Sequence, residues 1–110
     1  MNNDAQNCKS KDARLVIVET AEENTFLRGI LSSRPMKDYW IGMISSSSAV
    51  EGWKWSETNE DVTFFDWATG EPNRNDENCA VFGDTIEYRW ADVSCYSARN
   101  ILCERENLAK

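Results

Sequence analysis

The stretch TGEPNRNDENCA, residues 69–80, combines acidic, carboxamide and turn-forming residues in a segment without helical or strand periodicity. It contains three carboxylates, three carboxamides and one proline. One interpretation is a solvated turn rich in Pro, Asn and Asp. The other is a cage of oxygen ligands for a hard cation such as Ca²⁺, which takes about six to eight oxygens in irregular geometry. These residues alone leave both interpretations open.

The whole chain has 110 residues, of which 41% are apolar, and this predicts a single domain over 1–110 with a small core. Its cysteines are even in number and lack the C-x-x-C spacing of structural zinc sites, which favours two disulfides. Disulfides form in oxidising compartments, so we expect a secreted or extracellular protein. The cysteines are Cys8, Cys79, Cys95 and Cys103.

Targeting signals are also missing from the sequence. No signal-peptide pattern opens the chain, and no apolar run approaches the roughly 18 residues of a membrane span. A disulfide-bearing chain of this kind is expected to belong to a longer or processed protein.

Charge and composition exclude several classes of function. The net charge of −7 argues against nucleic-acid binding and permits cation binding. The absence of histidine removes the commonest general base and the usual catalytic triads. Glu71 paired with Glu77 or Asp92 would resemble a glycosidase, but carboxylates sharing one cation leave no free acid and base across a scissile bond. We therefore expect no enzyme.

Local patterns predict two helices in the first third of the chain. The first covers residues 3–13 and carries Cys8, and a β-rich run follows at 13–18. The second begins at a capping box at Thr20 and ends before Pro35. Its apolar residues at helical spacing are Phe26, Leu27, Ile30 and Leu31.

After Pro35, short aromatic and β-branched runs predict a mostly antiparallel sheet, which gives an α+β fold. A long segment at 56–78 has little regular patterning, and such loops are uncommon in compact domains unless they bind something. The predicted strands are 38–44, 52–57, 79–84, 88–93 and 100–106.

Ordered motifs between Cys8 and Cys103 together resemble the C-type lectin-like domain. They are WIGM (40–43), GWKW (52–55), GEPN (70–73), ENCA (77–80), WAD (90–92) and ILCERE (101–106). The resemblance implies two helices, small antiparallel sheets, a long calcium- and sugar-binding loop, and bridges of Cys8 with Cys103 and Cys79 with Cys95. The strand that precedes the first helix in the family has no counterpart here. The edge at 101–106 is then expected to be exposed, which favours strand swapping or dimerisation.

The resemblance also implies a site. Sugar-binding members hold one Ca²⁺ that coordinates two vicinal sugar hydroxyls, and the metal ligands also hydrogen-bond those hydroxyls. The matching residues here, for both metal and sugar, are Glu71, Asn73, Glu77 and Asp92. The EPN order resembles the mannose-type class, in which a cis peptide precedes the proline.

Ala91 departs from this pattern, because it stands where the family has asparagine. Its methyl group offers neither a ligand oxygen nor an amide donor. We expect this to weaken the binding of the ion and, more strongly, the binding of the sugar, since hydrogen bonds to a cation-bound hydroxyl are charge-assisted.

An auxiliary calcium site of the family is expected to be weak or absent. The two acidic residues of that site correspond here to Ser47 and Glu51, so a neutral serine replaces one of them. A further acidic residue of the family is replaced by Asn78. Partial compensation is expected from Asn75 and Asp76.

The five tryptophans suggest sugar stacking or core packing. Trp40, Trp53, Trp55 and Trp90 lie in motifs that support the core, and buried packing is the expectation for them. Trp67 is expected near the binding surface, and the pair Phe64–Phe65 is expected to anchor the long loop.

Three functions follow in order of support. The first is calcium-dependent binding of a mannose-type glycan. The second is recognition of a protein ligand by a lectin-like domain with weakened sugar binding, which Ala91 and Ser47 favour. The third is ice binding, against which the charged loop argues.

Overall fold

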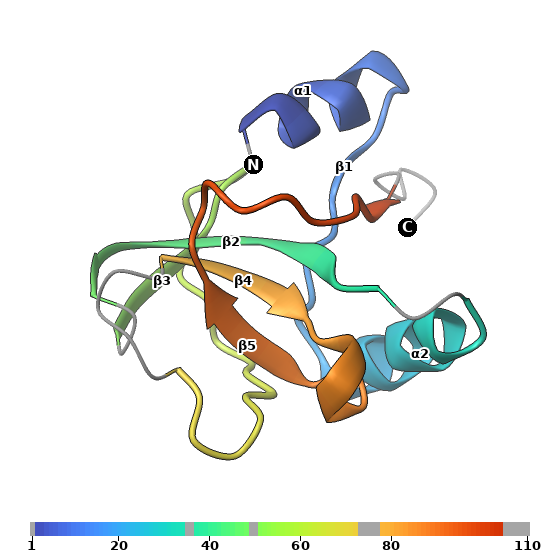
Figure 1. Ribbon diagram of the computed structural model, residues 1–110. Helices are drawn as coiled ribbons and strands as arrows, with labels where there is room; N and C mark the ends of the chain where they lie inside the picture. Colours follow the sequence, from blue (N-terminus) through green and yellow to red (C-terminus); the bar gives the residue numbers. More distant parts are fainter. Residues whose placement is uncertain (1, 35–36, 49–50, 73–77, 105–110) are drawn as a thin grey trace.

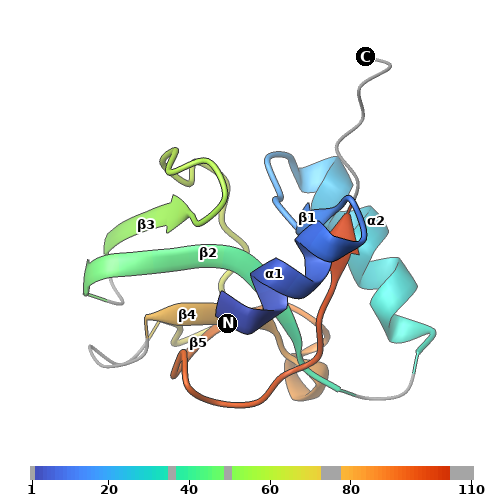
Figure 2. The ribbon, with the colours of Figure 1, turned by 90° about the horizontal axis from the view of Figure 1, so that it is seen from above.

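The structure, a computed structural model, describes residues 2–34, 37–48, 51–72 and 78–104. In Figure 1, α1 lies above the main sheet, α2 lies beside one end of it, and the yellow loop hangs below it; Figure 2 looks down on α1. This confirms the predicted α+β arrangement. The elements are α1 (Asn2–Ser10), β1 (Arg14–Leu15), α2 (Ala21–Ser32), β2 (Tyr39–Ser48), β3 (Glu51–Trp55), β4 (Cys79–Phe82), the 3₁₀ helix η1 (Asp84–Ile86), β5 (Trp90–Val93) and β6 (Cys103–Glu104).

The strands form two antiparallel sheets. The larger has the order β3-β2-β4-β5, and the smaller pairs β1 with β6. The run predicted at 13–18 is longer than the strand that forms. Val16 donates its N–H to Leu102 O while its own carbonyl accepts from Gly42 N, so the chain leaves β6 for β2 at this point. The predicted run at 100–106 likewise yields only the short β6 within the described residues.

Both faces of the larger sheet are buried at β4 and at the start of β2, which explains the continuous apolar residues of these two segments. Alternate residues of a strand point to opposite faces. On one face, Ile41 and Phe82 pack in a cluster with α2 and the long loop. On the other, Trp40 and Val81 pack around Cys8 of α1. The prediction that four tryptophans are packed is confirmed, since Trp40, Trp53, Trp55 and Trp90 are at most 4% exposed.

Thr20 is the N-cap of α2 as predicted, but the Glu23 carboxylate bonds Glu19 N rather than the Thr20 N–H of a standard capping box. Glu23 N donates to Thr20 Oγ1 at 3.1 Å, and the Glu23 carboxylate accepts from Glu19 N at 3.2 Å. The inner face of the helix presents Asn24, Leu27 and Leu31, which recur at helical spacing. Phe26 does not share this face and is 69% exposed. It lies about 200° around the helix from Asn24, at about 100° per residue.

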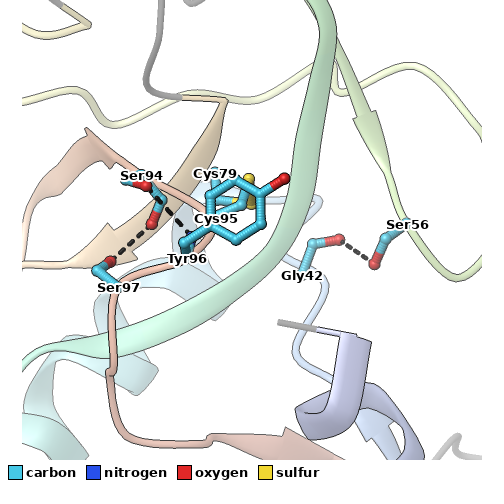
Figure 3. The surroundings of a disulfide bond; sticks show 7 residues. All are labelled: Gly42, Ser56, Cys79, Ser94, Cys95, Tyr96 and Ser97. Carbon is cyan, nitrogen blue, oxygen red and sulfur yellow. Dashed lines mark hydrogen bonds between the residues drawn. A yellow bond between two sulfur atoms is a disulfide. The ribbon is translucent and has the colours of Figure 1, made fainter.

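Both implied disulfides are present. Cys8–Cys103 ties α1 to β6, and Cys79–Cys95 ties the start of β4 to the turn after β5. In that turn Ser97 Oγ donates to Ser94 O and Tyr96 N donates to Ser94 Oγ (Figure 3). Within the described residues, β6 has β1 as its one strand neighbour. Dimerisation through its other edge stays a prediction.

A polar network joins α2 to the base of the long loop. Buried Asn24 accepts from Trp90 Nε1 at 3.0 Å and donates through Nδ2 to Asp66 Oδ2 at 2.7 Å. Asp66 also accepts from Arg28 and Arg89, at 3.4 and 3.3 Å. The network fixes residue 66 against both the helix and β5, so the loop leaves the core at a defined point.

Gly42 of β2 lies against Leu15 and Val16, at the end of β1. A Cβ at this position would lie 2.9 Å from the Val16 carbonyl oxygen, whereas one at Gly29 of α2 meets nothing within 4 Å. We predict that Gly42→Ala lowers the free energy of unfolding by about 1–3 kcal/mol through overpacking. The matched variant Gly29→Ala should raise it by about 0.5–1 kcal/mol, because alanine favours helix. Denaturant unfolding measures both, and equal effects would contradict the packing account.

Asn24 offers a second test of the fold. Asn24→Ala leaves the buried Trp90 Nε1–H without its acceptor and removes a donor from Asp66, which predicts a loss of about 1–3 kcal/mol of stability. Neighbouring Thr25 is exposed on the same helix, so Thr25→Ala should change stability by less than about 0.5 kcal/mol. Thermal unfolding compares the two variants. Similar midpoints for both would refute the role of the network.

Candidate functional site

The long loop runs along both outer edges of the larger sheet. Beside β3, Val62 N donates to Trp53 O and Trp55 N donates to Glu60 O. Beside β5, Trp90 N donates to Asp66 O and Ala68 N donates to Trp90 O, each at 2.9 Å. Unpaired strand edges expose donors and acceptors that must find partners. The loop supplies them, and this places its later residues along β5.

A tight turn follows and brings the chain to the candidate ligands. Glu71 N donates to Ala68 O at 2.9 Å, and Gly70 in this turn has φ +85°. A β-turn with a left-handed residue at its third position favours glycine there. The glycine of the GEPN motif is therefore explained by the turn that presents Glu71.

The turn brings Glu71 to the edge of β5. Its Oε1 accepts a hydrogen bond from Asp92 N at 3.3 Å. Asp92 itself is only 3% exposed, and it lies on the same strand face as Trp90. The Glu71–Pro72 peptide is cis, as the family resemblance implied. Two of the four expected ligand residues are thus brought together.

Ala91 lies between Trp90 and Asp92 on β5 but belongs to the other face. It packs against the cluster that contains Val81 and Cys79. A side chain at position 91 therefore starts on the opposite face of the strand from Asp92.

Of the other expected ligands, Asn78 belongs to the described residues. Asn73 and Glu77, together with the auxiliary residues Asn75 and Asp76, lie outside the described residues. Glu51 opens β3, but its side chain is not described. Asn78 is described, and its Oδ1 is buried without a hydrogen-bond partner in the described part of the chain.

The described side chains fit a hard cation. The atoms of Glu71, Asp92 and Asn78 that can ligate a metal are oxygens, the donor type that Ca²⁺ prefers. Asn78 Oδ1 in particular is a buried acceptor with capacity to spare. No group of three or more His, Cys, Asp or Glu side chains converges within the described residues.

Sequence reasoning missed the residues that hold the loop in place. Asn24 and Asp66 were not singled out, although their contacts decide where the loop meets β5. One signal was available: Asn24 is a lone carboxamide on an apolar helix face. Buried polar side chains need partners, so this asparagine predicts a polar group opposite it.

Comparisons with known proteins bear on the identity of the chain. The lectin C-type domain family matches residues 1–105. Human C-type lectin domain family 4 member C is 32% identical over 108 residues, covering 94% of this chain and 48% of that protein. A perlucin-like protein of Mytilus galloprovincialis is 29% identical over 94 residues, covering 83% of this chain and 60% of that protein. The chain spans about half the length of several of the curated relatives it matches.

Solved structures agree on the fold. Human lithostathine superposes with a TM-score of 0.83 at 23% identity, covering 96% of this chain and 83% of that one. A complex of SPL-1 with GlcNAc gives a TM-score of 0.77 at 25% identity, covering 93% of this chain and 76% of that one.

The chain has two disulfides, a loop that runs along both edges of the larger sheet, and a contact between Glu71 and Asp92. The family match extends over nearly all of its length. The chain therefore belongs to the C-type lectin domain family.

Proposed function

We propose that this domain binds mannose-type glycans through one Ca²⁺ held by Glu71, Asn73, Glu77 and Asp92. The observation that carries the proposal is the position of Glu71 against β5, where its carboxylate meets Asp92 N. Relatives support binding rather than catalysis: solved neighbours include SPL-1 with GlcNAc and the C-type lectin domain of murine dendritic cell inhibitory receptor 2 with an N-glycan.

The proposed ligand residues have different roles in binding. Asp92 is fixed on a paired strand and is largely shielded from solvent. It therefore loses little conformational entropy when the ion binds. Glu71 is held by its turn and by Asp92 N. When bound, Ca²⁺ supplies coordination to two vicinal sugar hydroxyls. Carboxylates accept hydrogen bonds from those hydroxyls, and the Asn73 amide is the proposed donor to them.

The setting of the domain is also a proposal. Two disulfides favour an extracellular location. In the described part of the chain, no helix has the length and apolar character that crossing a bilayer requires. Single sugar contacts are weak, so effective binding to a glycan surface would require several copies in one array.

Ala91 favours a second candidate, a lectin-like domain that recognises a protein ligand. The residue offers no ligand atom and packs on the opposite face from Asp92. This alternative predicts that neither a chelator nor a change at Glu71 alters the affinity of the domain for its protein partner.

Retention on mannan resin tests the leading proposal. We predict retention in millimolar Ca²⁺, elution by chelator, and loss of retention in Glu71→Gln. Glutamine keeps an oxygen that can accept from Asp92 N, so the loss would report the missing charge rather than a displaced loop. Removing a charge-assisted contact of about 1.5–3 kcal/mol should lower the affinity for Ca²⁺ by at least about tenfold.

The matched control is Glu60→Gln, a change of the same type at an exposed position of the same loop. It should be retained like the unmodified domain. Retention of the unmodified domain in chelator, or full retention of Glu71→Gln, would overturn the proposed function.

A further inference from the structure

The outer face of α2 exposes apolar surface to solvent. Phe26 is 69% exposed, on the side of the helix away from buried Asn24. A hollow of about 400 Å³ lies beside it, lined by Ala21, Glu22, Thr25 and Phe26 itself. In Figures 1 and 2, α2 lies at the periphery, and no other described helix or strand lies outside it. Single exposed phenylalanines are common on protein surfaces, so the neighbours of Phe26 decide whether this face binds something.

The two ends of this face carry opposite charges. Exposed Glu22 stands in the first turn of α2, and exposed Arg34 comes two residues after the helix ends. In the described part of the chain, neither side chain has an ion-pair partner. Two more exposed charges repeat the pattern, since Glu19 precedes the helix and Lys37 follows it. The face therefore has an acidic end and a basic end, about 18 Å apart at about 1.5 Å per residue.

The middle of the face has room for a second helix. Glu22, Phe26, Gly29 and Ser33 recur at spacings of four, three and four residues, so they form one stripe along the helix. Gly29 is exposed, and a Cβ at this position would meet nothing within 4 Å. A glycine permits close approach of another backbone. The centre of the stripe thus combines a projecting aromatic ring with a position that can accommodate one.

We propose that α2 is a self-association surface, on which two copies of this domain pair their α2 helices antiparallel about a twofold axis. A pair that crosses near residue 28 places Glu22 of each copy against Arg34 of the other. It also places each Phe26 beside the open Gly29 position of the other copy. Twofold symmetry makes every contact occur twice. A parallel pair would instead bring like charges together and align the helix macrodipoles unfavourably.

The charge pattern favours a second copy over an unrelated partner, because the face is complementary to itself. The pairing is expected to be weak, since one helix of 12 residues covers less than the roughly 800 Å² per partner of a standard interface. The net charge of −7 on each copy also opposes it. Pairing through α2 requires neither the calcium site nor a sugar. It would leave the yellow end of the long loop free, on the other side of the sheet in Figure 1.

Analytical ultracentrifugation of the whole domain, from about 10 to about 500 μM, tests this surface in the range expected for a small interface. We expect a reversible dimer. Phe26→Asp should raise its dissociation constant at least about tenfold, because a carboxylate would be buried at the centre of the seam. The matched control is Tyr96→Asp, which puts the same charge at another aromatic residue, one that is 100% exposed. It should leave the dissociation constant within about twofold.

A charge exchange tests the antiparallel geometry itself. Glu22→Lys opposes two cations at both ends of the pair, and Arg34→Glu opposes two anions, so each variant alone should be monomeric. An equimolar mixture of the two variants faces opposite charges at both ends and should form a heterodimer. Glu60→Lys makes the same change at an exposed position of the long loop and should dimerise like the unmodified domain. Thermal midpoints check that every variant is folded.

Three results would overturn the proposal. The first is an unmodified domain that stays monomeric over the whole concentration range. The second is a dimer that Phe26→Asp leaves intact, which would place the interface elsewhere, for example at the edge of β6. The third is a mixture of Glu22→Lys and Arg34→Glu that does not associate. Because these measurements contain no Ca²⁺ and no sugar, their failure would leave the proposed function untouched, and failure on mannan resin would not affect them.

Discussion

The outer edge of β5 is the constraint on which the rest of the site depends. A four-stranded sheet leaves two edges with unpaired backbone groups, and buried groups of this kind must be partnered. Here the long loop pairs with Trp90 through Asp66 and Ala68, and the carboxylate of Glu71 takes the next outward N–H, that of Asp92. The requirement to cover an edge thus places a candidate metal ligand beside a buried aspartate.

The polar network behind this edge explains how a long loop can hold a defined position. Asp66 is bound by Asn24 of α2 and by two arginines, while Trp90 is held by the same asparagine. Below the edge, Phe64 packs edge-on against Trp90 at 5.8 Å. The expectation that the phenylalanine pair anchors the loop is met by Phe64, whereas Phe65 remains substantially exposed.

Sequence patterns predicted much of this architecture because burial on both sheet faces leaves a strong apolar signal. The runs around Trp40, Cys79 and Trp90 became β2, β4 and β5. The capping box at Thr20 predicted the start of α2 because its hydrogen bonds are local. Asn24 and Asp66 could not be paired from sequence, since 42 residues separate them. The short strands β1 and β6 depend on long-range pairing in the same way. At the site, the family motifs identified Glu71 and Asp92 as candidate ligands. The face of β5 on which Ala91 lies could be assigned only from the register of that strand.

The central claim is that the loop around Glu71 and Asp92 holds Ca²⁺ despite Ala91. The most direct measurement is the thermal midpoint of the domain in chelator and in about 10 mM Ca²⁺, with no sugar present. An ion with a dissociation constant of about 1 mM that binds only the folded state adds roughly 1.4 kcal/mol of stability. The account predicts a rise of several degrees. An unchanged midpoint would contradict it and would leave the acidic stretch as a solvated turn.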